Sequence, residues 1–305
     1  MQDSPKSDLL PNLFLIGAPK AATTALADLL SRSREVDLGK TKEPGILVND
    51  SYGEARQRGL YRAHFAGCEA SRFRLDATPW TFYSARAPEI IDGLGPRGAT
   101  QILLSLRDPL GRIQSMYADQ VLRGRERRTY EDALKDSMRG VDQPLALSYV
   151  ATSCYGKHLE RWLDWRSAEL GIVFFEHAVD PGRAPGMIDA IGRRLGISLG
   201  PLQPANVRAT RSPILARPID AAVSAGSRLP AGVKARLRPG LSAVARQILR
   251  RSPSREVDLP STVISDAALR RDLESLLAAD RRLLRSRLTP GLLLLPELPE
   301  WMDGE

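Results

Sequence analysis

Cysteines and long apolar runs are both scarce in this chain. Cys68 and Cys154 are the only cysteines among 305 residues, and neither belongs to a C-x-x-C pair. This spacing disfavours a disulfide scaffold and a zinc ribbon. No stretch approaches the roughly 18–20 consecutive apolar residues of a membrane-spanning helix, and the first residues lack the basic and apolar regions of a secretory signal. We therefore expect a soluble, cytoplasmic protein without a transmembrane segment.

Aromatic residues are also few, at 6% of the chain, and basic residues outnumber acidic ones to give a net charge of +8. Proteins that bind single-stranded nucleic acid interleave aromatic and basic side chains, and the sequence has no such segment. The three histidines do not have the spacing of metal ligands. The net charge suits an anionic partner such as a nucleotide, an acidic glycan or an anionic lipid. We expect no nucleic-acid partner and no bound metal.

The pattern of residues 11–33 is a strand, a tight loop and a helix. An apolar run ends at Gly17, and helical leucine spacing begins at Thr23. In such a loop the free backbone N–H groups and the positive end of the helix suit a phosphate or sulfate group, to which Lys20 adds a full charge. The loop is not a Walker A motif, because Ala22 and the following threonine stand where that motif has its second glycine and its lysine. A plain strand-to-helix turn with a surface lysine is the alternative.

Short apolar runs and amphipathic helices alternate through the first two thirds of the chain. This order predicts an α/β fold, namely a P-loop-like doubly wound, mostly parallel sheet flanked by helices, with a helical C-terminal extension. We expect one domain over 1–305, made of an α/β core (11–200), an irregular basic segment (201–260) and a C-terminal helix and tail (261–305). The expected strands cover 13–16, 36–38, 72–75, 100–106 and 171–176. Three helices are expected to begin at residues 23, 109 and 129. Five more are expected over 52–65, 85–94, 148–169, 187–195 and 265–287.

A second candidate anion site follows the clearest buried strand, 100–106. Asp108 is expected to cap the next helix, and Pro109 to lie in its first turn. Arg107 then lies at the carboxyl end of a parallel strand, where such sheets bind ligands. A guanidinium group together with the hydroxyl of Ser115 suits a phosphate dianion. An arginine paired with a carboxylate at the sheet edge is the alternative.

Two further loops carry polar residues that suit chemistry. Lys42 and Glu43 precede Pro44, which favours an extended conformation; a solvated turn is the alternative. Asp76 and Thr78 follow the third expected strand, where an open α/β sheet places site residues. An Asx turn that caps a helix is the alternative for this pair.

Taken together, these motifs resemble those of the sulfotransferases that use 3′-phosphoadenosine 5′-phosphosulfate (PAPS), in their heparan-sulfate-type and bacterial branch. Residues 19–26 (PKAATTAL) resemble the 5′-phosphosulfate loop of that family, and residues 107–117 (RDPLGRIQSMY) resemble its 3′-phosphate motif. Lys42-Glu43-Pro44 and residues 76–80 (DATPW) resemble two more of its loops. The similarity covers about 11–200 and recurs in the last helix. One departure is Ala21-Ala22, where the family usually has serine or threonine followed by glycine.

The resemblance implies in-line transfer of a sulfuryl group from PAPS to a hydroxyl or amine of a glycan, a lipid or a secondary metabolite. Lys20 would neutralise the leaving 5′-phosphate oxygen, and Lys42 would contact the sulfuryl oxygens. Glu43 would be the general base, with Asp76 a second candidate base or an orienter of the acceptor. No metal would be required. The implied donor-binding residues are Lys20, Ala21, Ala22, Thr23, Thr24, Ala25, Arg107, Ser115, Arg208 and Arg211.

Some alternatives stay open. A P-loop kinase-like phosphotransferase would need a lysine directly before the threonine and a magnesium-binding carboxylate. A non-catalytic nucleotide-binding protein is kept open by Ala21-Ala22, because an alanine adopts positive φ less readily than a glycine. Arg208 and Arg211 would close over the nucleotide or form only a positive flank. If the chain is a sulfotransferase, Lys20 and Arg107 have to face the same cleft, close enough for the two phosphate groups of one bisphosphorylated nucleoside to reach both side chains.

Overall fold

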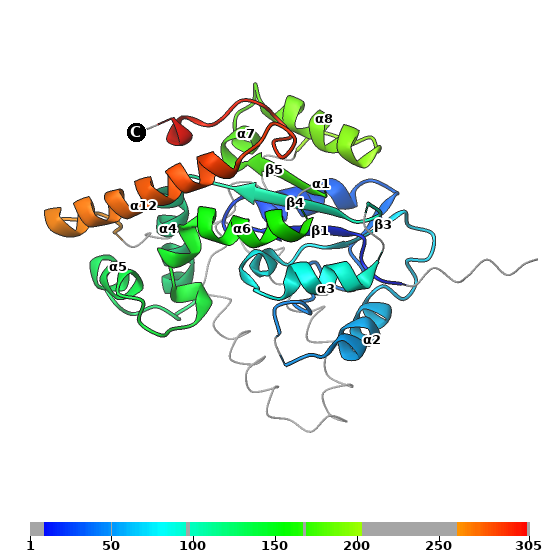
Figure 1. The fold of residues 1–305 in the computed structure, drawn as a ribbon, viewed down its shortest axis with the longest axis horizontal. Helices are drawn as coiled ribbons and strands as arrows, with labels where there is room; N and C mark the ends of the chain where they lie inside the picture. Colours follow the sequence, from blue (N-terminus) through cyan, green and yellow to red (C-terminus); the bar gives the residue numbers. More distant parts are fainter. Residues whose placement is uncertain (1–8, 50, 96–97, 167–168, 203–260, 304–305) are drawn as a thin grey trace, which may run out of the picture.

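The computed structural model of the protein describes residues 9–49, 51–95, 98–166, 169–202 and 261–303. Arg208 and Arg211, together with most of the expected basic segment, lie outside these ranges. Five parallel strands form one sheet in the order β2-β3-β1-β4-β5 (Figure 1). The predicted P-loop-like, parallel α/β fold is thereby confirmed. The strands are β1 (Leu13–Gly17), β2 (Val36–Asp37), β3 (Phe73–Asp76), β4 (Gln101–Leu106) and β5 (Leu170–Phe174).

Helices cover both faces of the sheet, and the predicted C-terminal helix is present (Figure 1). The α-helices are α1 (Thr23–Ser31), α2 (Glu54–His64), α3 (Ala87–Leu94), α4 (Pro109–Leu122), α5 (Tyr130–Met138), α6 (Tyr155–Arg166), α7 (Phe175–Val179), α8 (Ala184–Leu195) and α12 (Ala267–Arg287). Short 3-10 helices are η1 (Pro79–Tyr83), η2 (Leu145–Leu147), η3 (Ala151–Ser153) and η5 (Glu300–Met302).

Several expected boundaries are wrong, and two of them lie beside the candidate site. The helix predicted from residue 148 begins only at Tyr155. Before it, Ala151–Ser153 form a 3-10 helix, and the hydroxyls of Thr152 and Ser153 bond to carbonyl groups four residues earlier (2.7 and 2.9 Å), which weakens and bends a helix. The strand predicted to reach residue 176 ends at Phe174. The backbone turns there into α7, and Glu176 accepts a hydrogen bond from the backbone N–H that follows Arg107 (2.8 Å).

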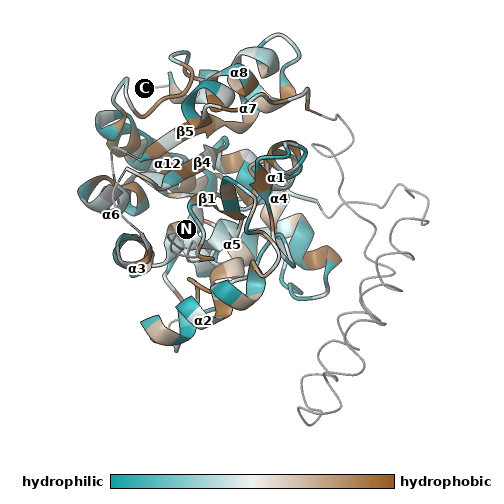
Figure 2. Ribbon diagram, turned by 90° about the vertical axis from the view of Figure 1, so that its right-hand side faces the viewer, coloured by the Kyte–Doolittle hydropathy of each residue, from teal (hydrophilic) through white to brown (hydrophobic). Residues whose placement is uncertain are grey.

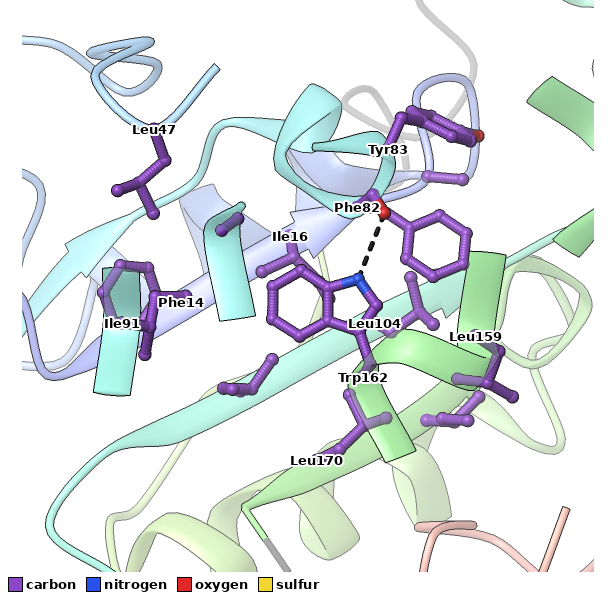
Figure 3. Close-up of a cluster of buried hydrophobic side chains, with 14 of the residues drawn as sticks. Phe14, Ile16, Leu47, Phe82, Tyr83, Ile91, Leu104, Leu159, Trp162 and Leu170 are labelled. Atoms are coloured by element: carbon purple, nitrogen blue, oxygen red, sulfur yellow. Dashed lines mark hydrogen bonds between the residues drawn. The ribbon is translucent and has the colours of Figure 1, made fainter. Parts of the chain in front are cut away.

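Alternate residues of the strands face opposite layers, as the pleat requires. Leu13 and Leu15 of β1 pack with α1 and α8, whereas Phe14 faces a second layer built with α3 and α6. In that second layer Trp162 of α6 is fully buried. Its indole N–H donates to the Phe82 carbonyl (3.1 Å), which ties α6 to η1 beside the central strands (Figure 3).

Helix α12 packs against α6 at Gly156, where an added Cβ would lie 2.9 Å from a backbone nitrogen of α12. The Gly156 N–H donates to Asp280 of α12 (3.0 Å). After α12 the chain returns to the sheet. Ile172 of β5 donates to the Leu292 carbonyl (2.7 Å) and accepts from the Leu294 N–H (3.0 Å). Residues 292–294 therefore lie along the outer edge of β5.

A third hydrophobic cluster joins α4, α5 and the first half of α12. It contains Tyr117 and Tyr130, whose ring centroids are 5.0 Å apart. Hydrophobic positions gather where the helices meet the sheet, and polar positions dominate the outward faces (Figure 2). None of the helices in the described ranges combines the length and apolar character that crossing a bilayer requires.

Candidate active site

The carboxyl ends of all five strands lie at one edge of the sheet, because the strands are parallel. The chain proceeds from β1 to one side of the sheet and later to the other, so the strand order reverses between β1 and β4, the position where such sheets bind ligands. Lys20 follows β1, and Arg107 follows β4. The Arg107 Nη1 donates to the Lys20 carbonyl oxygen (3.1 Å). The two predicted anion-binding segments are therefore adjacent.

The loop after β1 is fixed by its neighbours. Ala18 N–H donates to the Ser105 carbonyl (2.6 Å), and the Ser105 hydroxyl donates to the Ala21 carbonyl (2.6 Å). Gly17 permits a close approach, since an added Cβ would lie 2.8 Å from the Cβ of Phe82. The loop is thus held by β4 on one side and by η1 on the other.

Two non-glycine residues of this loop have positive φ, Lys20 at 72° and Ala22 at 61°. Ala22 precedes α1 directly and has no side-chain cap. The first hydrogen bond within the helix runs from Leu26 N–H to the Ala22 carbonyl (3.0 Å). The backbone N–H groups of residues 22–25 therefore have no acceptor within the helix. Such a turn gathers N–H groups around one point, as anion-binding nests do. The Ala21 N–H, by contrast, donates to the Ala18 carbonyl (3.1 Å).

The other predicted loop residues differ in exposure. Thr23 and Ala25 are buried, whereas Thr24 is exposed at the start of α1. The Thr24 hydroxyl accepts from the Lys42 ammonium (3.3 Å), and the same ammonium lies 2.6 Å from a Glu43 carboxylate oxygen. Glu43 itself is exposed. The structure thus brings Lys42 and Glu43 to the N-terminus of α1, beside the loop that follows β1.

Lys20 has a partner that the sequence reasoning missed. Its ammonium lies 3.1 Å from Asp119 Oδ1 on α4, and Arg123 donates to the other oxygen (2.7 Å). Burial disfavours the charge of Asp119, but the attraction of Lys20 and Arg123 outweighs it and holds the pKa of the carboxyl below its usual value. A signal was present: Asp119 follows Ser115 by four residues, which places both on one face of the helix.

Arg107 is half-buried, and its guanidinium lies over the ring of Phe175, 4.3 Å from the centroid. Burial lowers the pKa of Arg107, although the nearby Glu176 carboxylate opposes that shift. The side chain runs beside Gly111, where an added Cβ would lie 3.6 Å from two of its nitrogens. Ser115, partly exposed, stands one turn further along the same helix face.

Arg112 belongs to the same motif but is fully buried, and its Nε donates to the Pro19 carbonyl (2.9 Å). Asp76 is also buried, with 2% of its surface exposed. The Tyr61 hydroxyl and the Thr78 N–H donate to its two oxygens (2.7 and 2.9 Å). Burial raises the pKa of Asp76. Because both oxygens are engaged within the protein, an orienting role suits Asp76 better than that of a mobile base.

Within the part of the chain that the structure describes, no group of three or more histidine, cysteine, aspartate or glutamate side chains is arranged to hold a metal ion.

Comparisons with known proteins agree with the resemblance that the motifs carry. No family model matches the chain. Over 161 residues, 51% of this chain, it is 30% identical to heparan sulfate glucosamine 3-O-sulfotransferase 5 of Homo sapiens, and over 162 residues it is 30% identical to the protein of the same name from Mus musculus. The match covers 45% of each relative, so the chain spans about half the length of these curated proteins.

A solved structure shares the fold. The crystal structure of a sulfotransferase from Alicyclobacillus acidocaldarius superposes with a TM-score of 0.58 at 18% sequence identity, covering 90% of this chain and 94% of that one. The sequence relatives confirm the predicted resemblance to sulfotransferases, and this neighbour confirms the fold.

Proposed function

We propose that this relative of the sulfotransferases transfers a sulfuryl group from PAPS to an acceptor hydroxyl or amine. The observation that carries the proposal is the contact between the Arg107 side chain and the Lys20 carbonyl (3.1 Å) at the carboxyl ends of β1 and β4. The second cationic motif thereby touches the backbone of the loop that carries Lys20, just before α1. This arrangement supports the binding of one ligand with two separate anionic groups.

The donor's 5′-phosphosulfate would lie in the loop before α1, held by the amides of residues 22–25, the threonine hydroxyls and the Lys20 ammonium. Arg107 and Ser115 would bind its 3′-phosphate. A 3′-phosphate contact distinguishes PAPS from ATP, which lacks that group. Arg208 and Arg211 stay predicted donor contacts.

Transfer requires little more than alignment and charge stabilisation, as in phosphoryl transfer. The acceptor oxygen or nitrogen would attack sulfur in line while the bond from sulfur to the 5′-phosphate oxygen breaks, which leaves 3′,5′-bisphosphoadenosine. Lys20 would neutralise the leaving oxygen, and Lys42 would contact the sulfuryl oxygens. Glu43 would take the acceptor proton, and its exposure supports access to an incoming acceptor. The two ammonium groups would supply the charge that a metal ion provides in kinases.

Asp76 would support the loop that carries Glu43 and would not itself take the acceptor proton. Its neighbour Thr78 accepts from the Gly45 N–H (3.1 Å), so the Asp76–Thr78 turn supports the segment that carries Glu43. Among the acceptor classes, the similarity to heparan sulfate glucosamine 3-O-sulfotransferases of human and mouse favours a glycan hydroxyl, and the net charge of +8 suits an acidic glycan.

A thermal-shift comparison of 3′,5′-bisphosphoadenosine, ADP and AMP tests the donor site without knowledge of the acceptor. The bisphosphate should raise Tm clearly more than ADP at equal concentration, and AMP should raise it least. Equal shifts with the bisphosphate and ADP would contradict a 3′-phosphate site. Turnover of ATP that depends on magnesium would favour a phosphotransferase instead, and tight bisphosphate binding with no transfer from PAPS to any acceptor would favour a binding protein.

A further inference from the structure

Arg112 lies directly beneath the phosphate loop. It projects from α4, its side chain is fully buried, and its Nε donates to the Pro19 carbonyl (2.9 Å), one residue before Lys20. Its Nη1 donates to the hydroxyls of Thr152 (3.1 Å) and Ser153 (2.7 Å) of η3. Its Nη2 has no hydrogen-bond partner in the described ranges. One guanidinium group therefore ties the loop to α4 and η3.

None of the described carboxylates neutralises the charge of Arg112. Among the described residues, no carboxylate lies within 4.0 Å of it, and each of its acceptors is a carbonyl or hydroxyl oxygen. Arg128 provides a contrast, because it pairs with both Glu126 and Asp136 (2.7 Å each). Burying a cation without a counter-ion is costly. A binding site recovers that cost when an anionic ligand supplies the missing charge.

We infer that Arg112 is a positioning residue with two roles in anion binding. Through the Pro19 carbonyl it holds the loop in the conformation that directs the amides before α1 to the ligand. Its unneutralised charge, below the loop, also attracts the phosphate, which acts as its counter-ion. This inference rests on the proposed function in taking a phosphorylated nucleotide as the ligand.

The same side chain also lies near helix η1. The Arg112 Cζ lies 5.8 Å from the centroid of the Tyr83 ring in η1, and the Tyr83 hydroxyl donates to the Thr152 carbonyl (2.6 Å). Helix η1 follows the Asp76–Thr78 turn without a break. Arg112 therefore connects the donor loop with the segment that supports Glu43.

The test compares Arg112→Gln and Arg112→Lys with Arg128→Gln, a matched control for the loss of an arginine whose hydrogen bonds go to Glu126, Asp136 and Gln143 and not to the loop. The probes are 3′,5′-bisphosphoadenosine and inorganic phosphate, and Kd is measured by titration calorimetry beside the Tm of each free protein. Arg112→Gln should weaken bisphosphate binding by about tenfold or more, the scale of a charge-assisted contact. Arg112→Lys, which keeps the charge, should stay within about threefold of wild type. Arg128→Gln should lower Tm but leave Kd unchanged.

The outcomes separate the two proposals. If the wild-type protein does not bind the bisphosphate, the proposed function fails. If it binds and Arg112→Gln binds equally well, only the role of Arg112 is overturned, and the side chain merely stabilises the fold. A loss in Arg112→Lys as large as that in Arg112→Gln would overturn the charge argument. If Arg112→Gln does not fold, Arg112→Met replaces it, since an apolar chain suits a buried position, and the same thresholds apply.

Discussion

The ammonium of Lys20 lies 3.1 Å from the carboxylate of Asp119, and the two side chains are only 26% and 20% exposed. The carboxylate therefore stands beside the cation that is proposed to receive the donor's phosphate. An ammonium has three N–H donors, so the contact with Asp119 occupies only part of its capacity. The Asp119 carboxylate nevertheless repels a phosphate group that binds to Lys20.

Replacing this carboxylate should strengthen nucleotide binding. Asp119→Asn keeps the shape of the side chain but removes the charge that opposes the phosphate. We expect the Kd for 3′,5′-bisphosphoadenosine to fall about fivefold, equivalent to roughly 1 kcal/mol, as measured by calorimetry. Asp136→Asn, remote from the loop, is the control and should leave Kd unchanged. Weaker binding in Asp119→Asn would mean that the carboxylate holds Lys20 in place instead of competing with the ligand.

Removal of the proposed general base should affect turnover and spare binding. Glu43→Gln retains the size of the side chain but cannot accept a proton. We expect kcat to fall by about 100-fold or more, the usual contribution of a general base, while the Kd for the bisphosphate stays within about twofold. Glu54→Gln, an exposed change on α2, is the matched control. Full activity of Glu43→Gln would remove this carboxylate from the mechanism.

The 3′-phosphate site can be isolated by comparing two ligands on one variant. Arg107→Ala removes the guanidinium that lies between the loop and Phe175. Binding of 3′,5′-bisphosphoadenosine should weaken about 30-fold and that of AMP by less than about threefold, because only the first ligand carries the contacted group. Similar losses for both ligands, measured by titration, would place Arg107 at the 5′-phosphate or in a structural role.

The left-handed conformation of Ala22 predicts a stabilising substitution. Ala22→Gly relieves a φ of 61° that disfavours a side chain, so the free energy of unfolding should rise by about 0.5–1 kcal/mol. Ala21→Gly is the control, since Ala21 is fully buried and has no positive φ. This second change should destabilise the protein by loss of packing and by backbone entropy. Urea unfolding of both variants gives the comparison, and equal destabilisation would contradict strain at Ala22.

Acid sensitivity should arise partly from Glu126. Burial disfavours its charge, but hydrogen bonds from Arg128 and Tyr149 outweigh burial and lower its pKa from 4.5 to about 2. A depressed pKa contributes stability above the unfolded value that is lost as pH falls through the folded value. The difference in unfolding free energy between wild type and Glu126→Gln should therefore shrink by up to roughly 3 kcal/mol between pH 5 and pH 2. A constant difference over that range would contradict the assignment.

Local signals in the sequence predicted most of the fold. Asp108 and Thr129 were expected to begin helices, and their side chains accept from Gly111 N–H (2.8 Å) and Asp132 N–H (3.2 Å). Apolar periodicity located the strands, and parallel connections then required Lys20 and Arg107 to share an edge of the sheet. The miss at Tyr155 has a local cause, since hydroxyls before it bond to carbonyls four residues earlier, and such bonds disturb a regular helix.

The details of the site depended on contacts between distant segments. Periodicity alone does not show that Arg112 is buried under Pro19, because its neighbours in η3 come from another part of the chain. The same holds for the pairing of Lys42 with Thr24, which requires the loop after β2 to fold back over α1. Residue type and strand position predicted where charged groups would gather, and packing decided which of them lie at the carboxyl ends of β1 and β4.

The segment 292–294, which lies along β5, is synthesised long after that strand. Until it arrives, Ile172 presents unpaired backbone groups at the border of the sheet, and such borders recruit foreign strands. During translation the growing chain thus has an open edge at β5, while β1 and β3 are already flanked on both sides. Chaperone demand in the cell should consequently depend on how soon this late segment reaches β5.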